Sequence, residues 1–329
     1  MSQVAPTLEA FFTDRLIRQQ RVSPQTVRAY RDTFRLLLIF VQQRVQRAPH
    51  VMEWTDLDEA MISAFLDHLE HERHNTPRTC NSRLAAIRAF FRYAGLRHPE
   101  HAALIQRVLA IPQKRFTRKD IAFLTADEVE ALLRAPDLTK WEGRRDQALL
   151  LLATQTGLRL SELTGLRVRD LGLGAGAHVR CLGKGRKERT VPLADRAVAV
   201  LRHWMRERRG RDDDPLFPTR TGRRLSPDAI ERRVELMAQR AADEAPSLRS
   251  KQITPHVLRH TAAMTLLTAG VDTSVIALWL GHADTRSTQA YLHADLALKE
   301  KALALTTPPG VKPGRYRPED SLLAFLESL

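Results

Sequence analysis

Apolar side chains recur every three or four residues through most of the chain, which is the spacing of helices that bury one face. Residues 7–48 show this spacing on both sides of Ser23-Pro24, which has the form of a helix N-cap followed by proline at the first helical position. Two more helices are expected over Leu57–Arg73 and Thr76–Ala94. Residues 1–111 therefore predict an all-helical bundle.

The second part of the chain, residues 123–305, predicts a mostly α domain with a small antiparallel β-sheet. Thr125 and Glu128 have the spacing of a capping box, and an apolar helix over Ala148–Thr156 should end at Gly157. Strand-like runs flank a glycine-rich turn and predict a β-hairpin over His178–Leu182 and Arg189–Leu193. Further helices are expected over Asp195–Arg208, Ser226–Ala242, Pro255–Ala269, Thr273–Leu280 and Thr285–Leu292.

Two segments lie outside these domains. Residues 112–122 begin with proline and are rich in basic side chains, which suits an exposed linker. Residues 306–329 are first Pro-rich and then apolar, and a helix as short as Leu322–Leu329 is marginal alone in water. This tail either folds onto its own domain or reaches a neighbouring protomer, and the flexible connection before it favours exchange.

The positive net charge of the chain indicates a polyanionic partner. The 329 residues contain 52 Lys+Arg and 38 Asp+Glu, and the sequence pI is about 10.5. Residues 1–122 hold 19 basic and 12 acidic residues and residues 123–329 hold 33 and 26, so each part carries +7. Such a distribution favours nucleic acid, which both domains could contact. The alternative is a compositional bias of a GC-rich genome, because nine of the 52 basic residues are Lys.

Membrane and metal partners are not expected. The longest apolar stretches, such as Ala148–Ala153, are too short to span a bilayer, and the N-terminus lacks the pattern of a signal peptide. Cys80 and Cys181 lie far apart without metal-ligand spacing, so they are expected to be reduced, buried thiols of a cytoplasmic protein.

Basic residues that could contact DNA phosphates occur on the fourth helix, in the linker and in the hairpin turn. On the fourth helix they form a broad polar face opposite the apolar one, and the alternative is an ordinary solvated surface. The candidates are Arg78, Arg83, Arg88, Lys114, Arg115, Arg118, Lys119 and Arg186.

The second domain also carries residues suited to cleaving a phosphodiester without a metal. That reaction needs a nucleophile, cationic donors to the non-bridging oxygens and an acid for the leaving oxygen. Arg159 follows a predicted helix end, where a side chain can enter a cleft. His256 and Arg259 are three residues apart in the first turn of a predicted helix, whose N-terminus favours phosphate. His282 follows a helix end, and Tyr291 lies nine residues further on.

These segments resemble the catalytic domain of the tyrosine recombinases, the phage integrase and Xer-like family. The resemblance rests on TGLRLSEL, GKGRKER, HVLRH, LGH and AYLH, in order over about residues 125–300. It implies a SAM-like core-binding bundle joined to the catalytic domain in a C-shaped DNA clamp. It also implies a site-specific recombinase or integrase that needs no cofactor, metal or ATP and binds double-stranded DNA as a dimer per site and a tetramer in synapsis.

The resemblance assigns a role to each site residue. Arg159 and Arg259 would bind the scissile phosphate, and Lys184 would protonate the leaving 5′-oxygen, with Lys187 as its competitor. His256 and His282 would assist proton transfer, and Tyr291 would form a 3′-phosphotyrosine. Glu162 would orient Arg159, and His260 would be a structural neighbour.

Other interpretations remain. A type IB topoisomerase uses similar groups, and a DNA-binding regulator with a decayed site is a different class, although decay would have broken the residue set. His256 and His260 lack the Glu of a zincin motif and flank a cation, which opposes a metal pair. The glycines around Lys184 do not follow the order of a P-loop.

Overall fold

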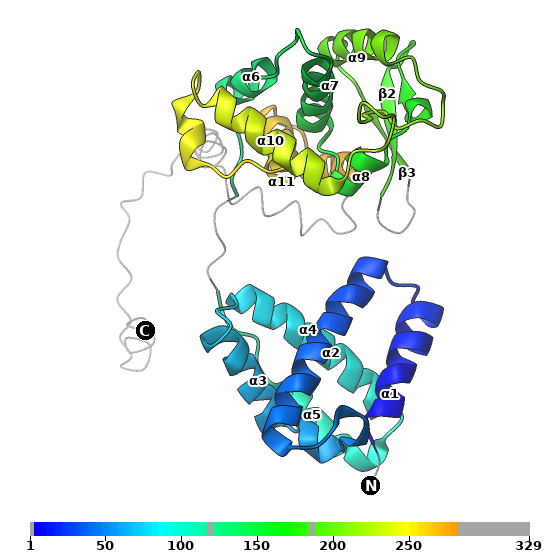
Figure 1. Ribbon diagram of the computed structural model, residues 1–329, viewed down its shortest axis with the longest axis vertical. Coiled ribbons are helices and arrows are strands. Elements are labelled where there is room, and N and C mark those ends of the chain that lie inside the picture. The colour runs from blue at the N-terminus through cyan, green and yellow to red at the C-terminus, as the bar shows by residue number, and fades with distance from the viewer. Residues whose placement is uncertain (1–2, 117–120, 184–187, 282–329) are drawn as a thin grey trace, which may run out of the picture. The chain divides into compact units, whose positions relative to one another are not determined.

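The computed structural model describes residues 3–116, 121–183 and 188–281, which belong to two units, Met1–Lys119 and Asp120–Leu329 (Figure 1). The predicted architecture, mainly α with one small antiparallel sheet, is confirmed. No helix among the described residues is both long and apolar enough to cross a membrane.

The N-terminal unit is a helical bundle. Its main elements are α1 (Ala5–Ala10), the π-helix η1 (Phe11–Gln19), α2 (Pro24–Val45), α3 (Glu59–His71), α4 (Pro77–Gly95) and α5 (Ala102–Ala110). Short 3₁₀ turns join them: η2 (Pro49–Val51), η3 (Trp54–Leu57) and η4 (Pro99–His101). The predicted cap of α2 is present, because the hydroxyl of Ser23 accepts a hydrogen bond from the backbone of Thr26. Thr76 caps α4 in the same way, by accepting from the backbone of Thr79.

Aromatic rings fill the core of this bundle. Phe11, Phe34 and Phe90 contact one another edge to face, and Trp54 stacks on Phe90 with ring centroids 5.8 Å apart. Helix α5, which the sequence analysis did not predict, adds Ile105 and Val108 to the same core. The bundle therefore buries one continuous apolar core.

The second unit is mostly helical. Its helices are α6 (Ala126–Arg134), α7 (Trp141–Thr156), α8 (Leu160–Gly165), α9 (Asp195–Arg208), α10 (Pro227–Ala241), α11 (Pro255–Thr268) and α12 (Thr273–Leu280), with 3₁₀ turns η5 (Val168–Asp170) and η7 (Pro246–Ser250). The capping box of α6 is confirmed: Thr125 and Glu128 each accept a hydrogen bond from the other's backbone N–H.

Helix α7 is the centre of this unit. Its residues Ala148–Ala153 are all buried, which explains their unbroken apolar run, and α7 contacts α6, α9 and α11. The helix begins at Trp141, seven residues earlier than predicted. The prediction was too short because the added turns are polar. Arg145 and Asp146 of these turns are nevertheless buried, and Asp146 forms ion pairs with Arg145 and with Arg233 of α10.

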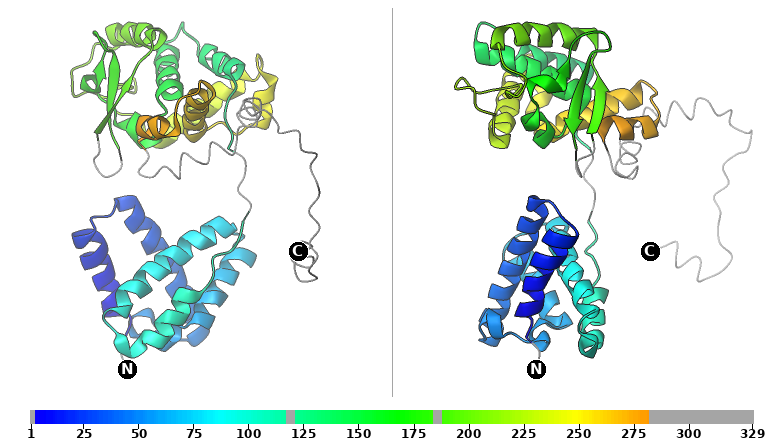
Figure 2. Two further views of the ribbon diagram at one scale, coloured as in Figure 1. Left: turned by 180° about the vertical axis from the view of Figure 1, so that it is seen from behind. Right: turned by 90° about the vertical axis from the view of Figure 1, so that its right-hand side faces the viewer.

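The sheet has the order β1-β2-β3, and all neighbours are antiparallel. The predicted hairpin is present as β2 (His178–Leu182) and β3 (Glu188–Pro192), which pair in a register that places Cys181 opposite Arg189. The two-residue strand β1 (Leu171–Gly172) was not predicted. Helix α9 lies across the end of the sheet where β2 begins (Figure 2).

The chain entering the second unit is fastened to α11. The Leu124 N–H donates to the hydroxyl of Thr261 over 3.0 Å, and the Lys251 ammonium donates to the Phe123 carbonyl and to the carboxylate of buried Glu128. Ile121 and Phe123 also pack against the apolar side chains shared by α11 and α12. The start of this unit is therefore held against α11, which carries His256 and Arg259, and against α12, which precedes His282.

Candidate active site

The first element of the site is the turn that joins α7 to α8. Gly157 ends α7 with φ +62°, and a Cβ there would lie 2.5 Å from the Leu280 side chain, so glycine is required for both conformation and space. Leu158 is buried, and Arg159 occupies the N-cap position of α8 in extended conformation. The turn therefore directs Arg159 toward the end of α12 rather than along a helix surface.

Glu162, in the first turn of α8, holds Arg159. Its carboxylate accepts hydrogen bonds from Arg159 Nη1 over 2.9 Å and from the Arg159 backbone N–H over 2.8 Å. The Glu162 side chain is only 2 % exposed. Burial alone would raise its pKa, but hydrogen bonds from Arg189 and Arg159 outweigh burial and lower the pKa, so Glu162 is ionised at neutral pH.

Arg259 enters the site from the first turns of α11 and is buried. Its Nη1 donates to the Gly157 carbonyl over 2.6 Å, and its Nη2 donates to the Leu280 carbonyl over 2.7 Å. On the same helix, the exposed ring of His256 lies edge to face with His260, with centroids 4.1 Å apart. The predicted i, i+3 relation of His256 and Arg259 is thus present on a single helix.

The end of α12 joins these parts. A helix leaves its last carbonyls without intrahelical donors, and here successive carbonyls receive guanidinium N–H groups instead. Arg189 donates to Trp279, Arg259 to Leu280 and Arg159 to Gly281, over 3.0, 2.7 and 2.8 Å. The structure therefore brings Arg159, Glu162 and Arg259 together at the point of the chain that precedes His282.

The charges of this site suit an anion. Among the described residues, the single carboxylate of Glu162 forms ion pairs with two guanidiniums, those of Arg159 and Arg189. The Arg159 side chain remains 33 % exposed, so its guanidinium can reach a ligand while Glu162 and Gly281 fix its plane. A guanidinium held in this way offers N–H donors of the kind that bind phosphate oxygens.

Several predicted residues lie outside the described part of the chain: Lys184, Arg186, His282, Tyr291, Arg118 and Lys119. The predicted helix Thr285–Leu292 and the tail 306–329 also lie outside it. The described chain reaches Gly183 at the end of β2 and Gly281 at the end of α12, so Lys184 and His282 are the next residues after these two glycines.

The described candidates for DNA contact differ in their surroundings. Arg78 and Arg115 are exposed, whereas Arg83 and Arg88 are half-buried. Burial and the nearby Arg73 lower the pKa of Arg83, and Arg88 donates to the carbonyl of Ile111 at the end of α5. Arg88 thus has a structural contact inside the bundle, and the DNA contacts of all four stay predictions.

Lys114 has a structural role that the sequence did not indicate. Its ammonium donates to the carboxylates of Asp67 and Glu70 on α3, and its backbone N–H and carbonyl both bond to the side chain of Asn81 on α4. Burial would lower the pKa of Lys114, but these carboxylates raise it. The segment expected to be an exposed linker is therefore anchored to the bundle at this residue.

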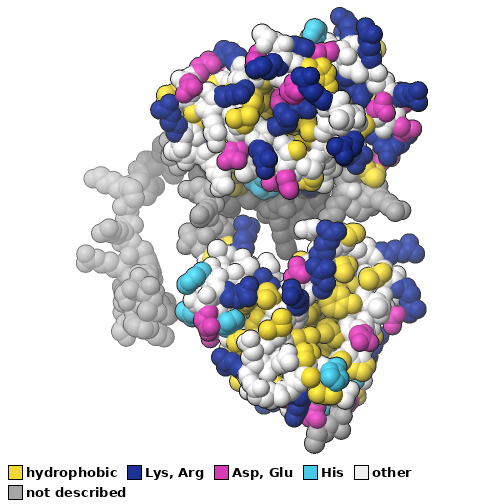
Figure 3. Space-filling view, viewed as in Figure 1, with side chains coloured by type: hydrophobic (Ala, Val, Ile, Leu, Met, Phe, Trp, Pro, Cys, Tyr) yellow, Lys and Arg dark blue, Asp and Glu magenta, His cyan; other side chains and the backbone are white. Residues whose placement is uncertain are grey.

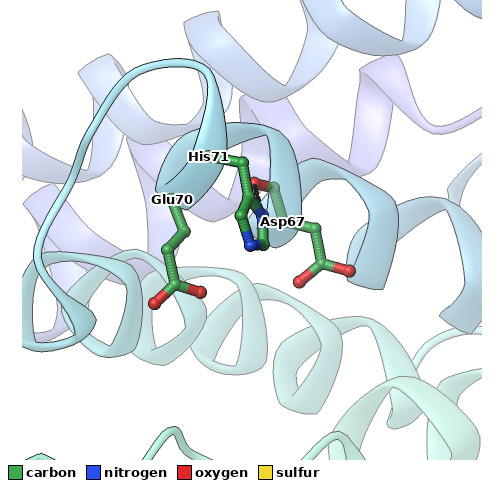
Figure 4. Close-up of side chains that lie close together, drawn as sticks. All are labelled: Asp67, Glu70 and His71. Carbon is green, nitrogen blue, oxygen red and sulfur yellow. Dashed lines mark hydrogen bonds between the residues drawn. The ribbon is translucent and has the colours of Figure 1, made fainter.

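The same carboxylates belong to one possible metal site. Figure 4 shows Asp67, Glu70 and His71 projecting from the end of α3, and they are the one such group of three possible ligands among the described residues. Lys114 occupies the space between the two carboxylates, and its charge opposes binding of a cation there. We assign this group to anchoring of the linker.

Basic side chains are spread over the visible face of each unit, as the even division of charge in the sequence indicated (Figure 3). Next to the site, a cleft of about 530 Å³ opens between α8 and β2, and Glu162 and Arg180 are among its lining residues. The site is therefore open to solvent on this side.

Arg189 is the functional candidate that the sequence analysis missed. It lies two residues before buried Val191 on β3, so strand alternation places its side chain on the inner face of the sheet. A charged residue at an inward strand position requires a partner, and this was the available signal. The partner, Glu162, lies 27 residues away and could not be identified from spacing.

Comparisons with known proteins identify the family of the chain. The sequence pattern of the phage integrase family matches residues 122–297, and that of its N-terminal SAM-like domain matches residues 10–98. The Sinorhizobium fredii protein y4rC, named an integrase/recombinase, is 53% identical over 328 residues, covering 100% of this chain and 99% of that protein. Tyrosine recombinase XerC of Xylella fastidiosa strain M23 is 35% identical over 290 residues, covering 88% of this chain and 93% of XerC.

Solved structures show the same fold. XerH recombinase bound to its difH substrate matches with TM-score 0.67 and 23% identity over 83% of this chain and 79% of XerH. The Tn1549 transposon integrase bound to transposon end DNA matches with TM-score 0.67 and 16% identity over 92% of this chain and 99% of that chain. On the extent of the family match and the identity to its relatives, the chain belongs to the phage integrase family.

Proposed function

We propose that this protein is a site-specific DNA recombinase that cuts and rejoins DNA strands through a covalent bond between Tyr291 and a phosphate. The observation that carries the proposal is the fixed pair of guanidiniums, Arg159 and Arg259, on neighbouring carbonyls at the end of α12. Its family membership supports the same activity, since its relatives include proteins named tyrosine recombinase and integrase/recombinase.

In the proposed reaction, the Tyr291 hydroxyl oxygen attacks phosphorus while the bond from phosphorus to the 5′-oxygen breaks. Lys184 gives a proton to the leaving 5′-oxygen, and Arg159 and Arg259 stabilise charge on the non-bridging oxygens. His256 and His282 hydrogen-bond phosphate oxygens and assist proton transfer, including the removal of the proton that the Tyr291 hydroxyl loses as it attacks. Religation reverses these steps when a 5′-hydroxyl attacks the 3′-phosphotyrosine, so the bond energy is conserved without ATP.

The proposed partner is double-stranded DNA carrying a specific site, bound by two protomers per site and four in synapsis. The XerH and Tn1549 structures contain bound DNA, which supports a DNA partner for this chain. The tail 306–329 is proposed to join neighbouring protomers, because an apolar helix after a Pro-rich connection can dock on another subunit.

A suicide substrate tests the proposal. DNA selected by the protein from a genomic fragment library is rebuilt as a nicked duplex that loses a short fragment after cleavage, and protein and DNA are incubated in EDTA. We expect a denaturant-stable protein–DNA adduct with the wild-type chain and none with Tyr291→Phe. A wild-type chain that binds the selected DNA but forms no adduct contradicts the proposal, and adduct formation by Tyr291→Phe contradicts the choice of nucleophile.

Plasmid relaxation separates the recombinase from a type IB topoisomerase. The recombinase should recombine plasmids that carry two copies of the selected site and leave a supercoiled plasmid without the site unchanged. Rapid relaxation of the plasmid without the site would support the topoisomerase instead.

A further inference from the structure

Arg189 is a charged residue in an interior position of the sheet. Its side chain is only 11 % exposed, and it lies opposite buried Cys181 in the β2–β3 register. Placing a guanidinium there is unfavourable unless its hydrogen bonds are satisfied. Its surroundings therefore indicate what the residue does.

The Arg189 guanidinium and Arg159 share one carboxylate. Glu162 Oε1 accepts from Nη1 of Arg189 and Nη1 of Arg159, each over 2.9 Å. Glu162 Oε2 accepts from Arg189 Nη2 over 2.7 Å and from the Arg159 backbone N–H over 2.8 Å. Each oxygen thus receives one bond from each arginine, so the position of the carboxylate depends on both.

Arg189 also holds the helix end on which the other two arginines converge. Its Nε donates to the Trp279 carbonyl, immediately before the carbonyls of Leu280 and Gly281 that bind Arg259 and Arg159. A Cβ on Gly281 would lie 2.8 Å from Arg189 Nη1, which shows how closely the guanidinium packs on this turn. Arg189 therefore connects β3, α8 and the end of α12.

We propose that Arg189 is a positioning residue of this site, which holds Glu162 and the end of α12 so that Arg159 presents its guanidinium to the scissile phosphate. The inference rests on the proposed recombinase function and adds a residue to it. Arg189 itself does not need to touch DNA. Its planar fork meets both carboxylate oxygens at once, which a lysine ammonium cannot do.

The ionisation of Glu162 makes the proposed role of Arg189 visible in the pH dependence of cleavage. Without Arg189, the pKa of Glu162 should be higher than in the wild-type chain, because the hydrogen bonds from Arg189 are the largest influence that opposes the effect of burial. A protonated Glu162 would have an O–H donor facing an Arg159 N–H group, and Arg159 would lose one acceptor. Cleavage by an Arg189 variant should therefore decline at a higher pH on the acidic side than cleavage by the wild-type chain.

Arg144 provides a matched control. It also forms a two-bond pair with a carboxylate, Glu207, over 2.7 and 2.6 Å, and also donates to a main-chain carbonyl, that of Leu138. The pair joins α7 to α9, and within the described part of the chain the hydrogen bonds of Arg144 go to Glu207 and Leu138 and not to Arg159, Glu162 or Arg259. Arg144→Met therefore removes the same kind of interaction without touching α8 or α12.

The experiment measures three quantities for Arg189→Met, Arg189→Lys and Arg144→Met: the rate of adduct formation on the suicide substrate across pH, the Kd for the same duplex, and Tm. We expect Arg189→Met to cleave about 100-fold more slowly, because misplacing a catalytic group by about 1 Å can cost that much. Its Kd should stay close to that of the wild-type chain. The acidic side of its profile of cleavage rate against pH should move to higher pH. Arg189→Lys should remain impaired, and Arg144→Met should cleave normally.

A double variant tests whether Arg189 acts through Glu162. If it does, Arg189→Met with Glu162→Gln should be no slower than the slower single variant, because the two residues act as one unit. Normal cleavage by Arg189→Met, or an equal loss in Arg144→Met, overturns the inference while the recombinase proposal stands. Absence of an adduct with the wild-type chain instead overturns the proposed function.

Discussion

Two arginines of the site meet the same helix end but differ in burial. Arg259 is 3 % exposed and bonds two main-chain carbonyls, whereas the side chain of Arg159 is 33 % exposed. Removing Arg259 leaves the Gly157 and Leu280 carbonyls without that donor in a buried position, which is costly. Removing the Arg159 side chain leaves the Glu162 carboxylate still bonded to Arg189 and to the backbone N–H of residue 159, so that buried group keeps most of its donors. Both residues are proposed to bind the phosphate, so we expect similar contributions to catalysis, and their difference in burial leads us to expect unequal contributions to stability.

We expect Arg159→Ala and Arg259→Ala each to abolish recombination and to slow adduct formation by about 10²–10³-fold, the loss that follows removal of one oxyanion donor. DNA binding should remain mostly intact in both, and only Arg259→Ala should lower Tm clearly. Cleavage rates, Kd and thermal melting measure the three effects. Recombination retained by either variant would refute its assignment to the phosphate.

Helices with local signals were predictable and contacts between distant elements were not. Ser23, Thr76 and Thr125 act on N–H groups three residues away, so their caps could be identified from spacing, and Gly157 ends α7 as expected. Arg159, Glu162 and Arg259 were selected from motifs, and the structure brings them together. The pairing of Arg189 with Glu162 could not be identified from the local sequence pattern, because it requires β3 to lie beside α8. The first turns of α7 were missed because they are polar, and the local pattern does not show that Arg145 is paired inside the fold.

At the scale of elements, Glu128 joins the start of α6 to the segment that leads into α11. Its buried carboxylate accepts from Lys251 over 2.7 Å and from the hydroxyl of Ser247 over 2.7 Å, and it caps α6. Burial would raise the pKa of Glu128, but these bonds lower it below 4.5 in the folded state. The stabilisation is therefore complete above the unfolded pKa and is lost as pH falls through the lower folded value.

We expect Glu128→Gln to destabilise the protein at pH 7 by about 1–3 kcal/mol, the cost of losing hydrogen bonds to a buried charged group. The difference from wild type should shrink as pH falls from the ordinary pKa of Glu, where the unfolded chain takes up a proton, through the lower pKa of the folded carboxylate, where the wild-type side chain becomes neutral as well. Denaturant unfolding at several pH values measures it. Glu130→Gln on the same helix is the control, because its pair with Arg196 is exposed and should contribute less than about 1 kcal/mol. A pH-independent loss would contradict the account.

At the scale of the molecule, both units carry basic surface, and the charge serves two purposes. Some cations bind carboxylates within their own unit, as Lys114 does with Asp67 and Glu70. Others, such as Arg78 and Arg115, are exposed. Net charge alone therefore overstates the number of side chains that are ready to neutralise phosphates. Two adjacent residues, such as Lys114 and Arg115, can differ in this respect, one paired within its unit and the other exposed.

Lys114 and Arg115 test this division directly. Each phosphate contact steepens the fall of DNA affinity with salt, with a slope in log K against log salt of about 0.9 per contact. We expect Arg115→Ala to reduce the slope by about 1 and to leave Tm unchanged. Lys114→Ala should lower Tm and leave the slope unchanged, because its ammonium already binds two carboxylates and its main chain is held by Asn81. Fluorescence anisotropy at several salt concentrations, with thermal melting of the free protein, separates the two. If Lys114→Ala instead reduced the slope as much as Arg115→Ala at unchanged Tm, Lys114 would leave its carboxylates for DNA, and the segment would be a DNA-contacting linker rather than an anchored one.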